Sequence, residues 1–253
     1  MQSSSRPPSS NQGHIHPRLA ATVCRHLQTK PRKPPAPHND AAFDMLLREL
    51  AERPRPLVLD SFCGTGHSTA ALARRHPGHL VVGIDKSLHR LSRHPENPGR
   101  SYLLLRAECE DFWRRLVERG IVVAHHYLLY PNPWPKAKHL QRRIHGSAAF
   151  YWLLRLAPEP AAGSDSPTHC ATGDNPAGRA PGRIELRSNW QTYVEEFGLA
   201  MQLAGYPGAV ARVPPAPALS LFERKYRDSG HDLWRFTAAM RNRGTHPATV
   251  SRG

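Results

Sequence analysis

Between residues 57 and 130, short apolar runs alternate with segments whose apolar residues fall on one helical face. The apolar runs predict buried strands at 57–59, 79–84, 102–105 and 121–130. The segments between them predict helices at 68–76, 87–94 and 110–119. Strands that alternate with helices in this way form a parallel sheet with helices on both faces. We therefore expect an α/β domain.

The pattern continues on either side of this region. Further elements are predicted as a helix at 40–53, a strand at 184–186, a helix at 190–203 and a strand at 233–240. Residues 157–182 interrupt the pattern with five prolines, four glycines and few apolar residues, which is typical of a flexible surface insertion. We assign the domain to residues 40–240, with this insertion inside it.

The two ends of the chain have a different composition. Residues 1–39 hold six Lys or Arg, seven prolines and no acidic residue, which predicts an extended, mobile arm with a short helix at 18–28. An RNA-contacting arm and plain disorder explain this composition equally well, and a transit peptide is a minor alternative. Residues 241–253 form a short basic tail.

Charge and composition narrow the classes of function. The chain has 253 residues, and 35 Lys plus Arg against 20 Asp plus Glu give a net charge of +15, which favours nucleic acid as a partner. No apolar run is long enough to cross a membrane, and no hydrophobic leader opens the chain. The four cysteines are widely spaced and do not indicate a disulfide framework, which favours a reducing compartment such as the cytoplasm. We expect no bound metal, since the neighbouring histidines His125 and His126 point to opposite faces of a strand. We also expect a monomer or a weak homo-oligomer.

The turn after the first predicted strand has the character of a ligand site. It reads Asp60-Ser-Phe-Cys-Gly64-Thr-Gly66 and leads into a helix, so the glycines let a ligand approach the backbone and the helix start offers N–H groups. Asp85 closes the second strand, where an acidic residue holds ribose hydroxyls in nucleoside-binding sheets. Thr69 stands at the third glycine of GxGxxG, which disfavours a dinucleotide site.

A second candidate site follows the fourth strand. Two prolines flank Asn132, Trp134 comes next, and four cations follow within ten residues. No acidic residue occurs between Arg119 and Pro158. A stiff polar residue, a stacking ring and a cationic stretch suit a base and its phosphates. A proline-stiffened loop with a solvated charge run is the simpler alternative.

The first turn, with Gly83-Ile84-Asp85 after it, resembles motifs I and II of class I S-adenosylmethionine-dependent methyltransferases. The resemblance implies a Rossmann-like, mostly parallel seven-stranded sheet. It also implies that S-adenosylmethionine is held by Asp60, Gly64, Gly66, Asp85 and Glu108. Glu108 alone would equally be explained as a solvated helix cap.

The second segment, Pro131-Asn132-Pro133-Trp134-Pro-Lys136 through Arg142-Arg143, resembles the Pro-Asp-Pro-Trp-x-Lys signature of bacterial tRNA (guanine-N7)-methyltransferases. Motifs around Asn189 and Ser220 match that family in order, so the resemblance covers about 57 to 240 without the insertion. It implies tRNA as the substrate. The residues expected to hold it are Lys136, Arg142, Arg143, Asn189, Ser220 and Glu223, with Lys138 as a further phosphate contact.

The departures from the family pattern bear on the chemistry. Asn132, expected to orient the acceptor base as the catalytic residue, and Asn189 replace two aspartates, and Phe62 replaces a glycine. Guanine N7 has no proton to remove, so an amide suffices to orient the base, although a carboxylate would better stabilise a cationic product. The alternatives are an RNA-binding relative with weak or lost catalysis, and a methyltransferase for another base, a small molecule or a protein.

Overall fold

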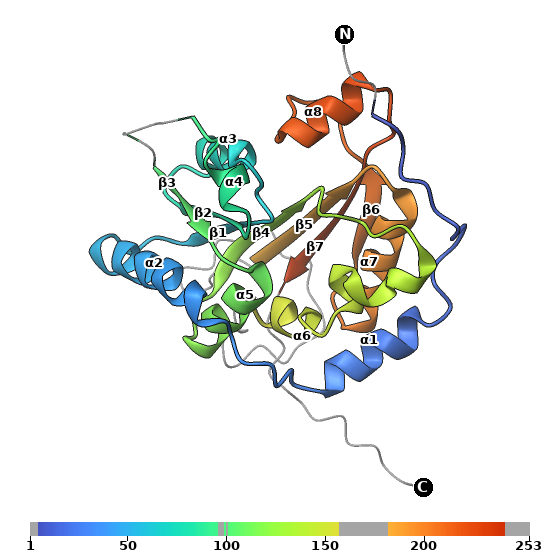
Figure 1. Ribbon diagram of the computed structural model, residues 1–253, viewed down its shortest axis with the longest axis horizontal. Helices are drawn as coiled ribbons and strands as arrows, with labels where there is room; N and C mark the ends of the chain where they lie inside the picture. Colours follow the sequence, from blue (N-terminus) through green and yellow to red (C-terminus); the bar gives the residue numbers. More distant parts are fainter. Residues whose placement is uncertain (1–4, 96–98, 100, 157–181, 241–253) are drawn as a thin grey trace, which may run out of the picture.

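The computed structural model describes residues 5–95, 99, 101–156 and 182–240, and these form one seven-stranded sheet flanked by helices (Figure 1). The strands are β1 Leu57–Ser61, β2 Leu80–Asp85, β3 Tyr102–Arg106, β4 Val123–Leu129, β5 Gly182–Ser188, β6 Gly208–Arg212 and β7 Trp234–Met240. They lie in the order β3-β2-β1-β4-β5-β7-β6, with β7 antiparallel to both neighbours and the other pairs parallel. The predicted Rossmann-like sheet is confirmed.

The first three strands are added toward one edge of the sheet and β4 is added on the other side of β1, so β1 lies between β2 and β4. The carboxyl ends of β1 and β4 therefore border the crevice in which open α/β sheets bind ligands. Both predicted sites follow these two strands.

The helices are α1 Leu19–Gln28, α2 Asp40–Glu52, α3 His67–Arg75, α4 Leu88–Leu91, α5 Cys109–Glu118, α6 Phe150–Leu153, α7 Gln191–Leu203 and α8 Leu221–Asp228. Short 3-10 turns lie at Pro37–Asn39, Ala137–Arg142, Ile144–Gly146 and Leu154–Leu156. The helix predicted at 87–94 is one short turn, and α6, α8 and β6 were not predicted because each is brief or polar. None of the described helices combines the length and apolarity needed to span a membrane.

A large apolar core covers one face of the sheet. It combines strand side chains with Leu46 of α2, Phe112 of α5, Phe150 of α6 and Phe197 of α7, all of which are fully buried. On the opposite face, Leu72 of α3 packs in a smaller core against β1 and β2. Helices thus cover both faces, but more extensively on the first.

The N-terminal segment differs from the predicted mobile arm. Within residues 5–39, Leu19 and Val23 of α1 are buried in the large core, and α1 packs along α7 (Figure 1). The short helix is as predicted, and its apolar face explains why the segment is held on the domain. The insertion predicted at 157–182 and the tail at 241–253 lie outside the described residues, apart from Gly182, which begins β5.

Candidate active site

The turn after β1 reverses the chain sharply into α3. Phe62, Gly64 and Gly66 have φ values of 64°, 61° and 77°, in the left-handed region, and Gly66 is the N-cap of α3. A Cβ on Gly66 would lie 2.6 Å from Leu104 Cδ1, and the positive φ at this position strains any other residue. A Cβ on Gly64 would meet nothing within 4 Å. The turn is therefore closed beneath Gly66 and open beside Gly64.

Asp60 lies buried at the start of this turn. Its Oδ2 accepts hydrogen bonds from Ser68 Oγ at 2.6 Å and Thr69 Oγ1 at 2.7 Å, which ties α3 to β1. Its Oδ1 is buried and has no hydrogen-bond partner. Burial raises the pKa of Asp60 to about 6. A buried acceptor without a partner is costly, which indicates a place for a donor or a positive charge.

Asp85 connects the turn to the end of β2. Its Oδ2 accepts a hydrogen bond from Gly64 N at 3.0 Å, and its Oδ1 accepts one from Ser87 N at 2.8 Å and pairs with Arg90 Nη2 at 3.1 Å. A carboxylate has about four lone-pair positions, so these three donors leave room for one more. Asp85 thus organises the turn and retains capacity for a ligand hydroxyl.

Glu108 is the N-cap of α5, at the carboxyl end of β3. Its carboxylate contacts His38 Nε2 at 2.6 Å, and its backbone N–H donates to Asn39 Oδ1 at 3.1 Å. Partial burial would raise the pKa of Glu108, but the hydrogen bonds from His38 and Asn39 outweigh this effect and lower it. Glu108 therefore stands where expected, but it also anchors the segment before α2.

The segment 130–143, here named the acceptor loop, begins with strained backbone. Tyr130 and Trp134 have φ values of 55° and 47°, which large side chains rarely adopt. Between them, Asn132 is exposed, and its Oδ1 accepts a hydrogen bond from Trp134 N at 3.2 Å. Tyr130 N donates to Arg187 O at 2.9 Å and so ties the loop to β5. Asn132 is held at the surface by its own turn.

Arg143 supports this loop from below. Its guanidinium donates to the carbonyls of Trp134 and Lys136 at 3.2–3.3 Å and to Gln12 Oε1 at 3.0 Å, and it pairs with Glu196 Oε2 at 2.5 Å. Arg143 is 0 % exposed, so it does not present its charge to an RNA phosphate. The structure thus differs from the phosphate contact expected for Arg143 and shows a loop-positioning role.

Glu196 of α7 is the centre of this buried network. Its Oε1 accepts hydrogen bonds from Gln12 Nε2 at 2.6 Å and His16 N at 2.8 Å, and His145 Nε2 lies 3.1 Å from its Oε2. Burial alone would raise the pKa of Glu196, but His145, Arg143 and the His16 amide outweigh it and lower the pKa to about 2. Burial lowers the pKa of His145, whose Nε2 lies within hydrogen-bond distance of the Glu196 carboxylate.

The N-terminal segment crosses the acceptor loop. Ser10 Oγ donates to Pro135 O at 2.6 Å, and Ala137 N donates to Asn11 Oδ1 at 3.1 Å. An open cleft of about 490 Å³ is lined here by Ser9, Ser10, Asn11, Lys136 and Lys138. Both lysines are exposed. The N-terminal segment and the cationic loop therefore share one surface.

Arg142, also exposed, places its guanidinium over the Trp134 ring at 4.8 Å. Trp190 is half-buried, and the Arg143 guanidinium lies 5.0 Å from its ring centroid, so this ring packs against the buried arginine. Arg142 thus lies on Trp134 at the surface, whereas Arg143 lies on Trp190 in the interior.

The remaining predicted residues lie in the connection between β5 and α7 and at the start of α8. Asn189 Nδ2 lies 3.1 Å from His231 Nδ1, and Ser220 caps α8 by accepting a hydrogen bond from Glu223 N at 3.1 Å. Glu223 is fully buried and pairs with Arg187 at 2.9 Å and Arg227 at 2.6 Å. The structure therefore differs from the nucleoside contact expected for Glu223, whose carboxylate fastens α8 to β5.

Known proteins match both the sequence and the fold. A family model described as "Putative methyltransferase" matches residues 54–155. The tRNA (guanine-N(7)-)-methyltransferase of Zymomonas mobilis is 27 % identical over 189 residues, 72 % of this chain and 74 % of that protein. The protein of the same name from Leifsonia xyli is 25 % identical, over 74 % and 78 % of the two chains. Over most of its length the chain is therefore similar to tRNA (guanine-N7)-methyltransferases, at identities of 25–27 %.

The fold is shared with the 16S rRNA methyltransferase KamB, whose crystal structure gives a TM-score of 0.50 at 17 % identity and covers 78 % of this chain and 94 % of that one. S-adenosylmethionine, the cofactor that the motifs after β1 and β2 imply, carries a positive charge and ribose hydroxyls. The residues here fit that molecule: Asp60 Oδ1 lacks a partner, Asp85 has a lone pair left, and the space beside Gly64 is open.

Sequence reasoning missed the network around Glu196. The signal was present, since Glu196 falls among the apolar positions Tyr193, Phe197 and Ala200 of a helix, where a charged residue needs a buried partner. Arg143 was that partner, and no acidic residue near it in the sequence could have neutralised it. The protein therefore keeps its acceptor loop in place through a charge pair formed across 53 positions.

Proposed function

We propose that the protein is an S-adenosylmethionine-dependent methyltransferase that modifies N7 of a guanine in tRNA. The observation that carries this proposal is the pairing of β1 with β4, with Ser61 opposite Leu128, which brings the glycine turn and the acceptor loop to one edge. Relatives over most of the chain have tRNA (guanine-N(7)-)-methyltransferase as their name. A cytoplasmic location accords with such a substrate.

The chemistry asks little of the protein beyond positioning. When bound, the cofactor supplies an electrophilic methyl group on a sulfonium. Guanine N7 offers a lone pair and no proton, so no general base is required. Asn132 projects from the strained turn between Tyr130 and Trp134, where its amide can orient a base edge. Its carbonyl dipole gives weaker support to a cationic product than the aspartate of the family would.

The RNA contacts proposed here use exposed cations. Lys136 and Lys138 line the cleft with the N-terminal segment, and Arg142 lies on the Trp134 ring. The net charge of +15 attracts polyanions without aligning them. These three residues, in contrast, lie in the same loop as Asn132, close to it in the sequence. They are therefore the contacts proposed to align tRNA with the acceptor loop.

The decisive experiment is transfer of a labelled methyl group to bulk tRNA that lacks modifications, followed by digestion and mass spectrometry of the nucleosides. We expect label in 7-methylguanosine with the wild-type chain and little with Asn132→Ala. Label in another nucleoside would show that the protein methylates tRNA but would refute guanine N7 as its target.

A second candidate is an RNA-binding relative without catalysis. It is favoured by Asn132 and Asn189, which both stand where the family has a carboxylate. In the same assay, binding of tRNA and of S-adenosylmethionine without any transferred label would establish this second candidate and overturn the first.

A further inference from the structure

Three histidines gather on the α3 face of the sheet, at the end opposite the candidate active site. His76 is the C-cap of α3, His79 immediately precedes β2, and His125 is near the start of β4. In the parallel pairing, His125 lies opposite Val58, the second residue of β1, whereas the glycine turn follows the last. The cluster therefore does not belong to the methyltransferase site.

The rings are close enough to share one ion. One ring nitrogen from each histidine lies within 4.8 Å of the others. The ring centroids are 4.6 Å apart for His76 and His125, 5.5 Å for His76 and His79, and 5.7 Å for His79 and His125. A tetrahedral ion with Zn–N bonds of about 2.0–2.1 Å needs nitrogens roughly 3.4 Å apart, so modest ring rotations suffice.

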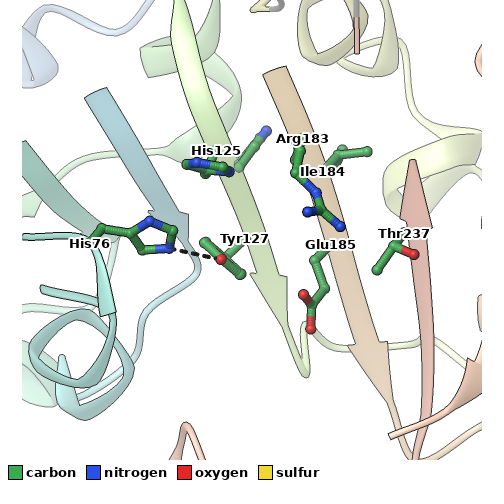
Figure 2. Close-up of a pocket in the computed structure, with 8 residues that line it drawn as sticks. His76, His125, Tyr127, Arg183, Ile184, Glu185 and Thr237 are labelled. Carbon is green, nitrogen blue, oxygen red and sulfur yellow. Dashed lines mark hydrogen bonds between the residues drawn. The ribbon is translucent and has the colours of Figure 1, made fainter. Parts of the chain in front are cut away.

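The hydrogen bonding of the rings leaves them available. The Nδ1 atom of His79 is buried and has no hydrogen-bond partner, which is unusual for a polar atom in a folded protein. The Nε2 atom of His76 lies 2.9 Å from the Tyr127 hydroxyl (Figure 2), and this hydrogen bond leaves its Nδ1 atom available.

A polar cavity adjoins two of the rings. It has a volume of about 180 Å³ and is lined by His76 and His125 together with Tyr127, Arg183 and Glu185 (Figure 2). The Arg183 charge repels a cation, but this side chain is exposed, so water and salt screen it. The carboxylate of Glu185, two positions further along β5, offsets part of that charge. The cavity can hold a water molecule as a fourth ligand.

We propose that His76, His79 and His125 bind one divalent transition-metal ion, with zinc as the class of ion and a water molecule in the fourth position. Three neutral imidazoles suit Zn²⁺, Ni²⁺, Co²⁺ and Cu²⁺ and exclude Mg²⁺ and Ca²⁺, which prefer oxygen ligands. The ion joins the end of α3 to β2 and β4. The sequence hides this site because 46 positions separate His79 from His125, and the only adjacent pair, His125 and His126, is split across the sheet.

The test uses the untagged full chain and Zn²⁺ alone, in competition with a chromophoric chelator. We expect one Zn²⁺ per chain, and an affinity more than about tenfold weaker in each of His76→Ala, His79→Ala and His125→Ala, since loss of even an outer-shell partner costs about 10–100-fold. His89→Ala is the matched control, because His89 is an exposed histidine of α4 outside the cluster. Its affinity is expected to match the wild type.

Cobalt gives a second readout that does not depend on how stable the variants are. Wild-type chain loaded with Co²⁺ should show the visible absorption of a four-coordinate ion, and Zn²⁺ should displace it. Circular dichroism of the three variants confirms that they are folded. Absence of stoichiometric binding, or equal binding by the wild type and a folded His79→Gln variant, would overturn the proposal. Neither readout involves methyl transfer.

Discussion

The Arg143 guanidinium lies 2.5 Å from the Glu196 carboxylate, and neither side chain is exposed. The pair joins α7 to the acceptor loop and, through Gln12 and His16, to the N-terminal segment. Two charges buried together are stable only as a pair, so the loop geometry depends on both.

Glu196→Gln is expected to lower the free energy of unfolding by about 3–5 kcal/mol, because it leaves the Arg143 charge buried and unpaired. Chemical denaturation measures this change. Hydrogen exchange should also become faster in residues 10–16. Glu195→Gln is the matched control, since Glu195 is a half-buried neighbour that bonds only Gln191 among the contacts described. It should change stability by less than about 0.5 kcal/mol, and an equal loss in both variants would contradict the role of Glu196.

Asp60 should make cofactor binding depend on pH. Its folded pKa of about 6 is above the usual 3.8, so the folded state holds this proton more tightly, and the contribution of Asp60 to stability falls as the pH rises from about 4 to 6. Above that range the ionised carboxylate attracts a positively charged ligand. Affinity for S-adenosylmethionine, measured by calorimetry, should therefore weaken as the pH falls through about 6.

Asp60→Asn removes this titration and should flatten the pH profile, with weaker binding at neutral pH. Asp44→Asn, at an exposed position of α2, should retain the wild-type profile. A profile that is unchanged in Asp60→Asn would remove Asp60 from the cofactor site.

Asn132→Asp tests the acceptor chemistry. The aspartate can accept the same hydrogen bond from Trp134 N, so the turn should persist, and its charge should stabilise a cationic product ring. Methyl transfer at saturating substrate should be preserved or raised, by up to about 100-fold. Loss of transfer in Asn132→Asp, with folding intact, would instead establish a role that requires the amide.

Lys138→Ala should weaken tRNA binding and reduce its salt dependence. Loss of one phosphate contact lowers the slope of log K against log salt by about one. Arg48→Ala is the control, because Arg48 is an exposed cation on α2, on the other side of the molecule from the acceptor loop (Figure 1). Equal slopes for both variants would show that binding follows net charge alone.

The strands and long helices could be predicted because their signals are local. The runs at 57–59 and 79–84 correspond to β1 and β2, and the amphipathic segment at 190–203 corresponds to α7. The glycine turn could also be predicted, since Gly64 and Gly66 adopt the left-handed backbone conformation that favours glycine. These features depend on neighbours within a few positions.

The roles of the charged residues could not be predicted in the same way. Arg143 and Glu223 belong to motifs beside the acceptor, yet both are buried against partners far along the chain. Residues 5–39 differ from the mobile arm expected for residues 1–39 for a related reason. Their polar composition conceals a few anchors, such as Gln12 and Leu19, that meet surfaces formed by distant segments.

The crossing of the N-terminal segment has a consequence for the order of events during synthesis. Ser5 N donates to Ser229 Oγ at 3.0 Å, and His231 Nε2 lies 2.7 Å from Ser5 O, across more than 220 positions. Residue 5 is thus synthesised well before its partners and makes these contacts only after residues 229 and 231 have emerged from the ribosome. Contacts of such sequence separation form slowly, so we expect docking of the N-terminal segment to be a late step of folding.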